Sequence, residues 1–172
     1  LGAFDYGVDV LLTSGGASVG ERDYGQDVLR DLGVRLDFWK ILMRPGKPLM
    51  FGTRGKTLVF GLPGNPISAF VTATVLVRPA LRLMTGHTDP FFPFMGVPLA
   101  ADLPPGGERR HFMRGKLNRN EIGFLEVTPI AETDSNHSSS LARADALIIQ
   151  PEDSPGIPAG EIVEIIPLNM LG

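Results

Sequence analysis

Residues 43–70 of this 172-residue chain read MRPGKPLMFGTRGKTLVFGLPGNPISAF, and they predict the local fold. Apolar residues on both sides of Arg54-Gly55 predict a hairpin over residues 48–61, with that dipeptide at its tip. In the turn at residues 63–66, Asn65 is a good N-cap, and Pro66 suits the first helical position, where its missing N–H costs nothing. The segment therefore predicts a hairpin that leads into a long helix.

The same segment has features that suit an anion. Arg44 and Lys47 stand three residues apart, and the prolines on either side of Gly46 restrict the backbone that carries them. A helix N-terminus presents N–H groups and a partial positive charge, which proteins use to hold phosphate and other oxyanions. We interpret the segment as an anion cradle. The alternative is two solvated cations and Pro-Gly pairs that only interrupt the chain.

A glycine-rich loop precedes this segment. Residues 8–12 are an apolar run typical of a buried parallel strand, residues 13–20 read TSGGASVG, and a helix closed by Gly33 is expected over residues 23–32. A strand, a glycine-rich loop and a helix in this order let backbone amides approach a phosphate or a polar ring. Gly15, Gly16 and Ser18 are therefore candidate binding residues, although many such loops are only turns.

Charged residues flank the two predicted strands. Asp23 begins the first helix, where an acid fits the helix dipole; its functional interpretation is as a metal ligand or proton acceptor. Residues 34–41 predict a second strand with Lys40 near its end. Because ligands collect outside the carboxyl ends of strands in an open α/β sheet, we expect Asp23, Lys40 and Arg44 on the same side of the sheet.

Composition narrows the class of protein. The chain has 43% hydrophobic residues, a net charge of −3 and no cysteine. These values are typical of a globular protein, give no general attraction to nucleic acid or anionic membranes, and exclude disulfides and thiolate chemistry. The most apolar segment, residues 67–84, is interrupted by Thr72, Thr74, Arg78 and Pro79, which favours a buried helix over a membrane span. We expect a cytoplasmic protein.

The sequence pattern changes after residues 87–94, HTDPFFPF. Beyond this segment, short apolar runs separated by turn residues predict a small all-β sandwich or barrel. These runs cover residues 96–101, 110–117, 123–130, 146–150 and 162–166. The fold class expected is α/β plus all-β: an incomplete three-layer α/β domain over residues 1–87, followed by a β domain over residues 88–172.

The β domain has its own candidates for reaching an anion. They are Arg109, Arg110 and Arg114, together with the polar residues 134–140, which include Ser135 and His137. The alternative is that the arginines form the wet face of a strand and the serine run is a loop. His137 by itself is a poor metal site, because no carboxylate pattern accompanies it.

Dense motifs in this chain resemble those of a known family. In order, they are TSGGASVGERDY, FWKILMRPGKPLMFG and VFGLPGNPISAFVTATVLVRPALRLMTG. They resemble the C-terminal half of the molybdopterin molybdenumtransferases, which include the gephyrin E-domain. The likeness continues more loosely through RRHFMRG and SNHSSSLARADALIIQPE, so it covers nearly the whole chain. It implies a transferase that inserts molybdenum from molybdate into adenylylated molybdopterin and releases AMP, assisted by Mg²⁺ or another divalent metal.

The resemblance also implies roles for particular residues. Asp23 would serve metal or substrate chemistry, and Lys40 and Arg44 would be catalytic cations, with Arg44 where the family often has lysine. The residues implied in substrate binding are Gly15, Gly16, Ser18, Lys47, Pro48, Pro63, Gly64, Asn65, Pro66, Arg114 and Ser135. Fixed cations and backbone N–H donors would offset the repulsion between molybdate and the phosphoanhydride.

The resemblance covers only part of a family member. Full-length members carry further N-terminal domains and the first elements of the α/β domain, and they form homodimers. We therefore expect a C-terminal fragment that is inactive alone and exposes a sheet edge. Two alternatives remain: a non-catalytic molybdopterin- or nucleotide-binding module, and an interaction scaffold of the gephyrin type.

Overall fold

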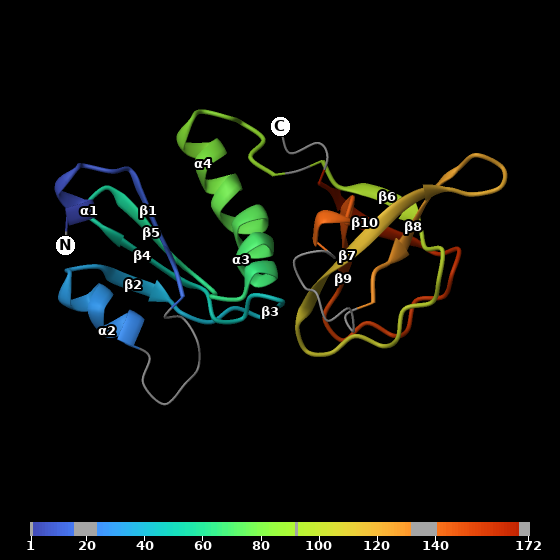
Figure 1. Cartoon of the computed structure of the whole chain (residues 1–172), viewed down its shortest axis with the longest axis horizontal. Coiled ribbons are helices and arrows are strands. Elements are labelled where there is room, and N and C mark those ends of the chain that lie inside the picture. The colour runs from blue at the N-terminus through green and yellow to red at the C-terminus, as the bar shows by residue number, and fades with distance from the viewer. Residues whose placement is uncertain (1, 16–23, 92, 132–140, 169–172) are drawn as a thin grey trace. The chain divides into compact units, whose positions relative to one another are not determined.

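The structure is a computed structural model that describes residues 2–15, 24–91, 93–131 and 141–168 (Figure 1). Two compact units share the chain: Leu1–Ile41 with Pro45–Pro90, and Leu42–Arg44 with Phe91–Gly172. The helices and strands are α1 Gly2–Asp5, β1 Val10–Ser14, α2 Tyr24–Asp31, β2 Arg35–Phe38, β3 Met43–Arg44, β4 Met50–Arg54, β5 Thr57–Leu62, α3 Pro66–Thr72, the π-helix η1 Ala73–Val77, α4 Arg78–Met84, β6 Met95–Pro98, β7 Arg110–Arg119, β8 Leu125–Pro129, β9 Ala146–Gln150 and β10 Ile162–Pro167.

A four-stranded sheet in the order β1-β5-β4-β2 forms the centre of the first unit. β1 and β5 are parallel, whereas β4 is antiparallel to both of its neighbours, β5 and β2. β2 consequently runs in the same direction as β1 and β5. The predicted hairpin is β4–β5, and Gly55 in its turn has a φ of 58°, a left-handed value that glycine adopts without strain.

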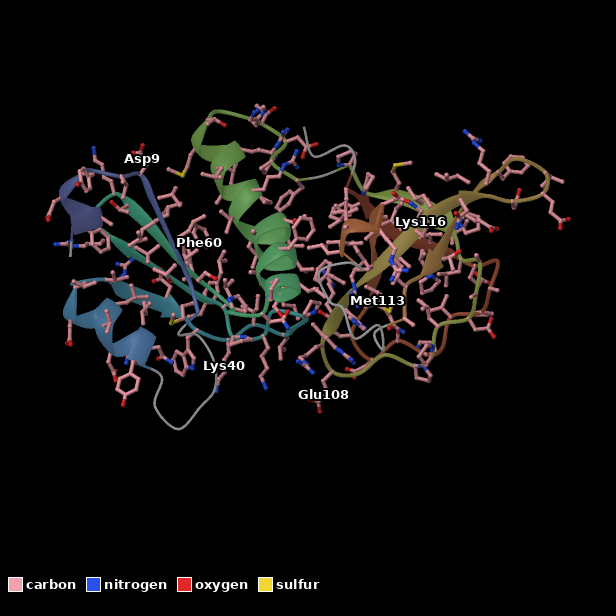
Figure 2. The ribbon with its side chains drawn as sticks, viewed as in Figure 1. Asp9, Lys40, Phe60, Glu108, Met113 and Lys116 are labelled. Carbon is pink, nitrogen blue, oxygen red and sulfur yellow. The ribbon has the colours of Figure 1, made fainter. Side chains whose placement is uncertain are left out.

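Helices cover both faces of this sheet, as the three-layer prediction requires. On one face Phe4 of α1 and Leu29 of α2 pack with Val59 of β5. On the opposite face Phe60, the next residue of β5, packs with Val77 of the long helix (Figure 2). Because successive residues of a strand point to opposite faces, the single strand β5 supplies both cores.

The long helix contains a π-helical turn, η1, which we did not predict. This turn ends at Val77, two residues before Pro79. Pro79 has no N–H to donate to the carbonyl of Val75 four residues earlier, so the regular bonding pattern cannot continue there. The helix is 19 residues long and apolar enough to cross a membrane by length and composition alone. Its contacts with the sheet, through Val77, Leu76 and Ala73, explain the apolar face as the packed side of a core helix.

β1 lies at one edge of the sheet. Among the described residues it pairs with β5 alone, and Leu12 in its middle is 48% exposed. A strand with unpaired backbone groups on one side is a template for pairing with another strand. This arrangement agrees with the sheet edge expected from the sequence.

The second unit is all-β, and the five strands predicted in it are all present. Its sheet has the order β3-β7-β9-β10-β6, and β8 pairs with the later part of β7. A bridge between Leu99, which follows β6, and Val127 of β8 brings the two ends of the sheet together around one core. The largest buried side chains of this core include Ile148 and Ile165.

β3 is a strand that we did not predict. It has only two residues, Met43 and Arg44, which align in parallel with Arg110 and His111 of β7. The chain therefore leaves the first unit for three residues and returns to it at Pro45. Two residues are too few to show the alternation by which a strand is recognised in a sequence.

Candidate functional site

Two glycine-bearing corners meet at the carboxyl edge of the first unit's sheet. β1 ends at Ser14 and β5 at Leu62, which are direct neighbours in the parallel ladder, and the N–H of Gly15 donates to the carbonyl oxygen of Leu62 at 3.2 Å. A Cβ atom added to Gly64 would lie 3.5 Å from the Cα atom of Gly15. The backbones of the two corners are thus close together, and both positions lack a Cβ atom because both are glycine.

The start of the long helix stands at the same corner. Asn65 is its N-cap, with its side-chain oxygen accepting from the N–H of Ser68 at 3.1 Å, and Pro66 follows at the first helical position. Pro66 has no N–H, and the N–H of Ala69 donates to the carbonyl oxygen of Asn65 at 2.9 Å. In the first turn, Ile67 therefore contributes the remaining backbone donor, and Asn65 acts as a helix cap.

Lys40 and Lys47 belong to this edge as well. β2 runs parallel to β1 and β5, so Lys40, two residues beyond its end, lies on the edge where those strands end (Figure 2). β4 runs the opposite way and begins at Met50, which places Lys47 and Pro48 at that edge too. The N–H of Ile41 donates to the carbonyl oxygen of Lys47 at 3.1 Å and ties the two stretches together.

The first unit therefore gathers several predicted residues at one sheet edge. Both ammonium groups belong to exposed residues, whereas Pro63 is buried and fixes the path between β5 and the helix. The residues at this edge are Gly15, Lys40, Lys47, Pro48, Pro63, Gly64, Asn65 and Pro66. Two cations, two bare glycine backbones and a helix N-terminus are the features of a site that binds phosphate or another oxyanion.

Arg44 and Arg114 lie in the second unit. Arg44 is aligned with His111 across the β3–β7 pair, and Arg114 stands three positions further along β7. Because this spacing is odd, the side chains of His111 and Arg114 leave opposite faces of the sheet. Arg114 is only 6% exposed. The structure therefore assigns Arg44 to the sheet of the second unit, whereas we expected it with Lys40 at the carboxyl edge of the first unit's sheet.

The neighbouring arginines have different surroundings. Arg110 pairs with Glu152, and the distance between Nη2 of Arg110 and Oε2 of Glu152 is 3.3 Å. Arg109 lines a small pocket together with Arg44, Glu108 and His111. His111, which also lines this pocket, was not among the residues that we singled out from the sequence. No local pattern marks it, because its position beside Arg44 depends on pairing between strands 67 residues apart in the sequence, from 44 to 111.

Comparison with known proteins assigns the two units to domains of the same family. Residues 2–83 match the family described as "Probable molybdopterin binding domain", and residues 96–168 match the "MoeA C-terminal region (domain IV)". The chain belongs to the molybdopterin molybdenumtransferase family. The order of the two matched regions agrees with the α/β and all-β units of the structure.

Relatives in this family are much longer than the chain. A molybdopterin molybdenumtransferase of Haemophilus influenzae is 36% identical over 167 residues, which are 95% of this chain and 40% of that protein. The molybdenum cofactor synthesis protein cinnamon of Drosophila melanogaster is 33% identical over 166 residues, 27% of its length. The crystal structure of a molybdopterin biosynthesis moea protein from Pyrococcus horikosii has a TM-score of 0.76 and 30% identity, covering 92% of this chain and 37% of its own.

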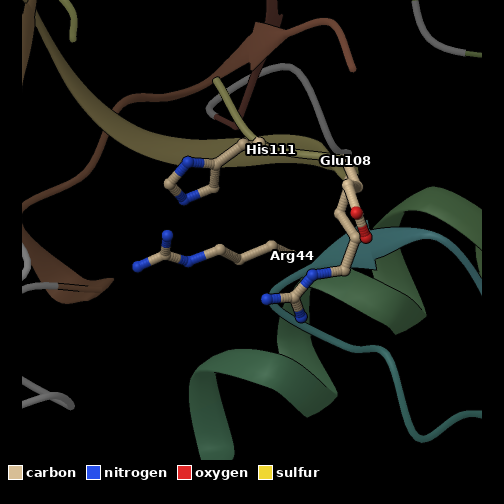
Figure 3. Close-up of a pocket in the computed structure, with 5 residues that line it drawn as sticks. Arg44, Glu108 and His111 are labelled. Atoms are coloured by element: carbon tan, nitrogen blue, oxygen red, sulfur yellow. The ribbon is translucent and has the colours of Figure 1, made fainter. Parts of the chain in front are cut away.

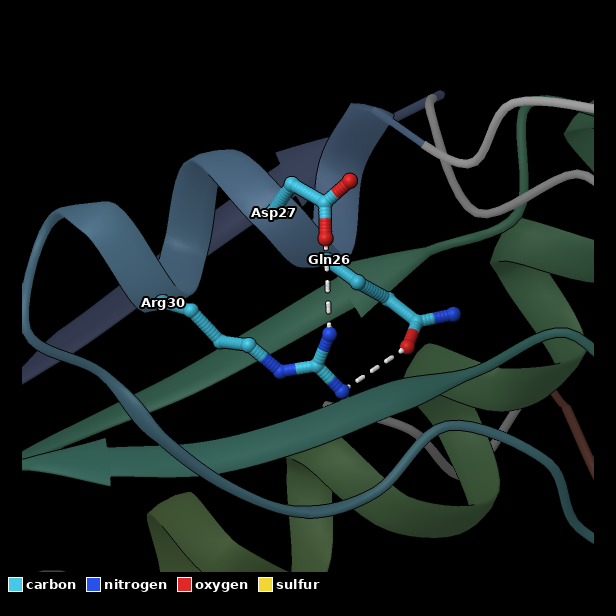
Figure 4. A network of polar contacts seen from close by, with 3 residues as sticks. All are labelled: Gln26, Asp27 and Arg30. Atoms are coloured by element: carbon cyan, nitrogen blue, oxygen red, sulfur yellow. Dashed lines mark hydrogen bonds and ion pairs between the residues drawn. The ribbon is translucent and has the colours of Figure 1, made fainter.

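Four predicted site residues lie outside the described residues. They are Gly16, Ser18, Asp23 and Ser135, and His137 lies outside them as well. In the described ranges no group of three or more His, Asp or Glu side chains is arranged to hold a metal ion. Asp27, in the first turn of α2, is engaged with Arg30 at 3.4 Å, and Gln26 accepts from the same guanidinium (Figure 4). The described residues alone do not make a metal site, so a divalent metal at Asp23 stays a prediction.

Proposed function

We propose that this chain is the C-terminal part of an enzyme that inserts molybdate into adenylylated molybdopterin and releases AMP. The chain spans about two fifths of the length of its Haemophilus influenzae relative, so this activity is proposed for the whole protein. The observation that supports it best is the gathering of Gly15, Gly64, Lys40, Lys47 and the helix start at one sheet edge. Each of these features favours a negatively charged ligand.

The proposed mechanism rests on charge and close approach. Glycines at positions 15 and 64 let a phosphate come near the backbone, since no Cβ atom stands in the way. Lys40 and Lys47 supply positive charge for the phosphoanhydride and for molybdate, and the amide of Ile67 supplies a backbone donor. An oxygen of molybdate or of water would form the new bond to the phosphorus atom of molybdopterin while the anhydride phosphorus–oxygen bond to AMP breaks. These same groups would stabilise the negative charge that develops on the departing AMP.

Other parts of the proposal come from the family resemblance. They are substrate binding by Gly16, Ser18, Arg114 and Ser135, a catalytic role for Arg44, and Mg²⁺ or another divalent metal held by Asp23. A bound metal would neutralise phosphate charge. We also propose a homodimer and a cytoplasmic location, and a boundary between the two domains near residue 87.

Replacing Lys47 tests the proposed site directly. In titration calorimetry of the intact chain, Lys47→Ala should weaken the binding of AMP or molybdate by about tenfold, because one charge-assisted contact to an oxyanion is lost. Lys56→Ala is the matched control, because Lys56 lies in the β4–β5 turn at the opposite edge of the sheet. Equal affinities for the wild type and Lys47→Ala would reject the oxyanion role.

A further inference from the structure

The second unit contains two adjoining hollows. The smaller has a volume of about 190 Å³ and is lined by Arg44, Gly107, Glu108, Arg109 and His111 (Figure 3). The larger has a volume of about 490 Å³ and shares Arg44, Gly107 and His111 with the smaller one. A volume of this size lies in the range of roughly 300–1,000 Å³ found for small-molecule sites. We call the pair the Arg44–His111 pocket.

The small part of the pocket is rich in positive charge. Two guanidinium groups and one imidazole line it, against the single carboxylate of Glu108. Arg44 and His111 are aligned on adjacent strands, so their side chains leave the same face, and they extend alongside each other in Figure 3. An arginine fork and an imidazole N–H are suitable donors for the oxygens of a phosphate or carboxylate.

The large part of the pocket is mainly apolar. Met113 stands two residues beyond His111 on β7 and therefore faces the same way, and Leu103, Pro104 and Ile130 complete the apolar wall. Such a wall favours a flat or apolar group over a hydrated ion. A ligand that fills both parts must therefore combine an anionic end with an apolar body.

A buried amide gives the pocket a fixed polar point. Gln150 lines the large part, is only 3% exposed, and donates from Nε2 to the carbonyl oxygen of Pro104 at 2.8 Å. This bond ties the loop around Pro104 to strand β9, so the apolar wall is held in place before any ligand binds. It engages the amide nitrogen and not the amide oxygen, which is the acceptor of the side chain.

We propose that the Arg44–His111 pocket binds an organic anion. Its phosphate or carboxylate group would contact Arg44, Arg109 and His111, and its flat or apolar body would pack on Leu103, Met113 and Ile130. This site lies within the second unit and on the face of β7 opposite to Arg114. The inference shares Arg44 with the proposed catalytic residues, and its other contacts use only residues that line this pocket.

Phenyl phosphate is a probe with both required parts. Inorganic phosphate has only the anionic part, and phenol has only the apolar part. In calorimetric titrations of the intact chain, we expect phenyl phosphate to bind at least about tenfold more tightly than either of the others, since each part adds its own contacts. A titration with benzoate in place of phenyl phosphate shows whether the pocket also binds a carboxylate. Phenyl phosphate that binds no more tightly than inorganic phosphate would overturn the proposal.

Matched variants locate the binding. His111→Gln and Ile130→Asp should each weaken the binding of phenyl phosphate by about tenfold. The first removes a donor, and the second puts a charge of the same sign as the ligand in the half-buried pocket wall. The controls His87→Gln and Ile122→Asp change exposed residues outside the pocket and should leave the affinity unchanged. Circular dichroism checks that each variant is folded. If Lys47→Ala abolishes the binding instead, the ligand lies at the first unit's sheet edge and the proposal fails.

Discussion

Asn65 shows what a single residue contributes at the sheet edge. Its side chain caps the long helix through Ser68, so removing the oxygen leaves a backbone donor without its partner. Asn65→Ala should lower the free energy of unfolding by about 1 kcal/mol, the usual cost of a lost N-cap. Urea unfolding measures the change. Asn65→Ser keeps an oxygen acceptor and should retain most of the stability, and equal losses in both variants would contradict capping as the cause.

Asp145 links one residue to the dependence of stability on pH. One of its oxygens, Oδ2, lies 2.9 Å from Nζ of Lys116 and accepts from the N–H of Leu117 at 3.1 Å. The hydrogen bond from Lys116 is the main reason that the pKa of Asp145 falls below its ordinary value of 3.8; the Leu117 N–H and the charge of Lys116 lower the pKa further, and burial opposes them. The ionised carboxylate is therefore favoured more in the folded state than in the unfolded state.

The sign of the pH effect follows from this shift. A carboxyl with a lowered pKa in the folded state adds stability above its unfolded pKa, and this stability is lost as the pH falls through the folded value. Asp145→Asn should therefore reduce the free energy of unfolding at pH 7, and the difference from the wild type should shrink below pH 3.8. Urea unfolding across this range measures it, with the exposed Asp89→Asn as control. If the difference in the free energy of unfolding between the wild type and Asp145→Asn did not change with pH, the ionised Asp145 carboxylate would not be its cause.

At the scale of an element, β7 is the strand on which the second unit is built. It pairs with β3, β8 and β9, and Gly115 in its middle lets the core close over it. A Cβ atom at Gly115 would lie 2.6 Å from Cγ2 of Val127 and 2.9 Å from Cγ1 of Ile148, so one of the neighbours would have to move. The close packing around this strand therefore depends on glycine.

Gly115→Ala should accordingly destabilise the second unit. We expect a loss of about 1–3 kcal/mol, which is the usual cost of adding a methyl group to a well-packed core. Thermal or urea unfolding measures the loss. Gly107→Ala is the control, because nothing lies within 4 Å of a Cβ atom at that position. Equal stability of the two variants would show that the core adjusts without cost.

At the scale of the whole molecule, the chain order and the division into units do not coincide. Residues Leu42–Arg44 lie between two elements of the first unit but belong to the second, where β3 pairs with β7. Met43 in β3 is only 5% exposed. A substitution in this short strand should therefore destabilise β7, which is distant from it in the sequence.

Met43→Ala tests this connection. Loss of a buried methionine side chain usually costs about 2–5 kcal/mol, so β3 should loosen from β7. Hydrogen–deuterium exchange should become faster at residues 110–114 and stay slow in the β4–β5 hairpin, which is nearer in the sequence. Met84→Ala, at a 44% exposed position, is the control. If exchange became faster only in β4 and β5, the effect of the substitution would not pass through the β3–β7 pair.

The sequence by itself determined the elements and the sheet edge of the first unit. Local chemistry is sufficient there: Asn65 and Pro66 start a helix, glycine follows β1, and apolar runs bounded by turn residues give the strands of the second unit. The short helix α1, the π turn beside Pro79 and the two-residue strand β3 escaped prediction. A proline in a helix can be accommodated in several ways, and two residues show no periodicity.

Only the tertiary structure decided which side chains share a surface. Gly15 and Gly64 meet because β1 and β5 pair side by side, and Arg44 stands beside His111 because β3 pairs with β7. It also sets Arg114 on the other face of β7, away from the surface of Arg44 and His111. A sequence gives the order of residues along one strand, whereas register and neighbours are fixed by packing between segments that are far apart in the chain.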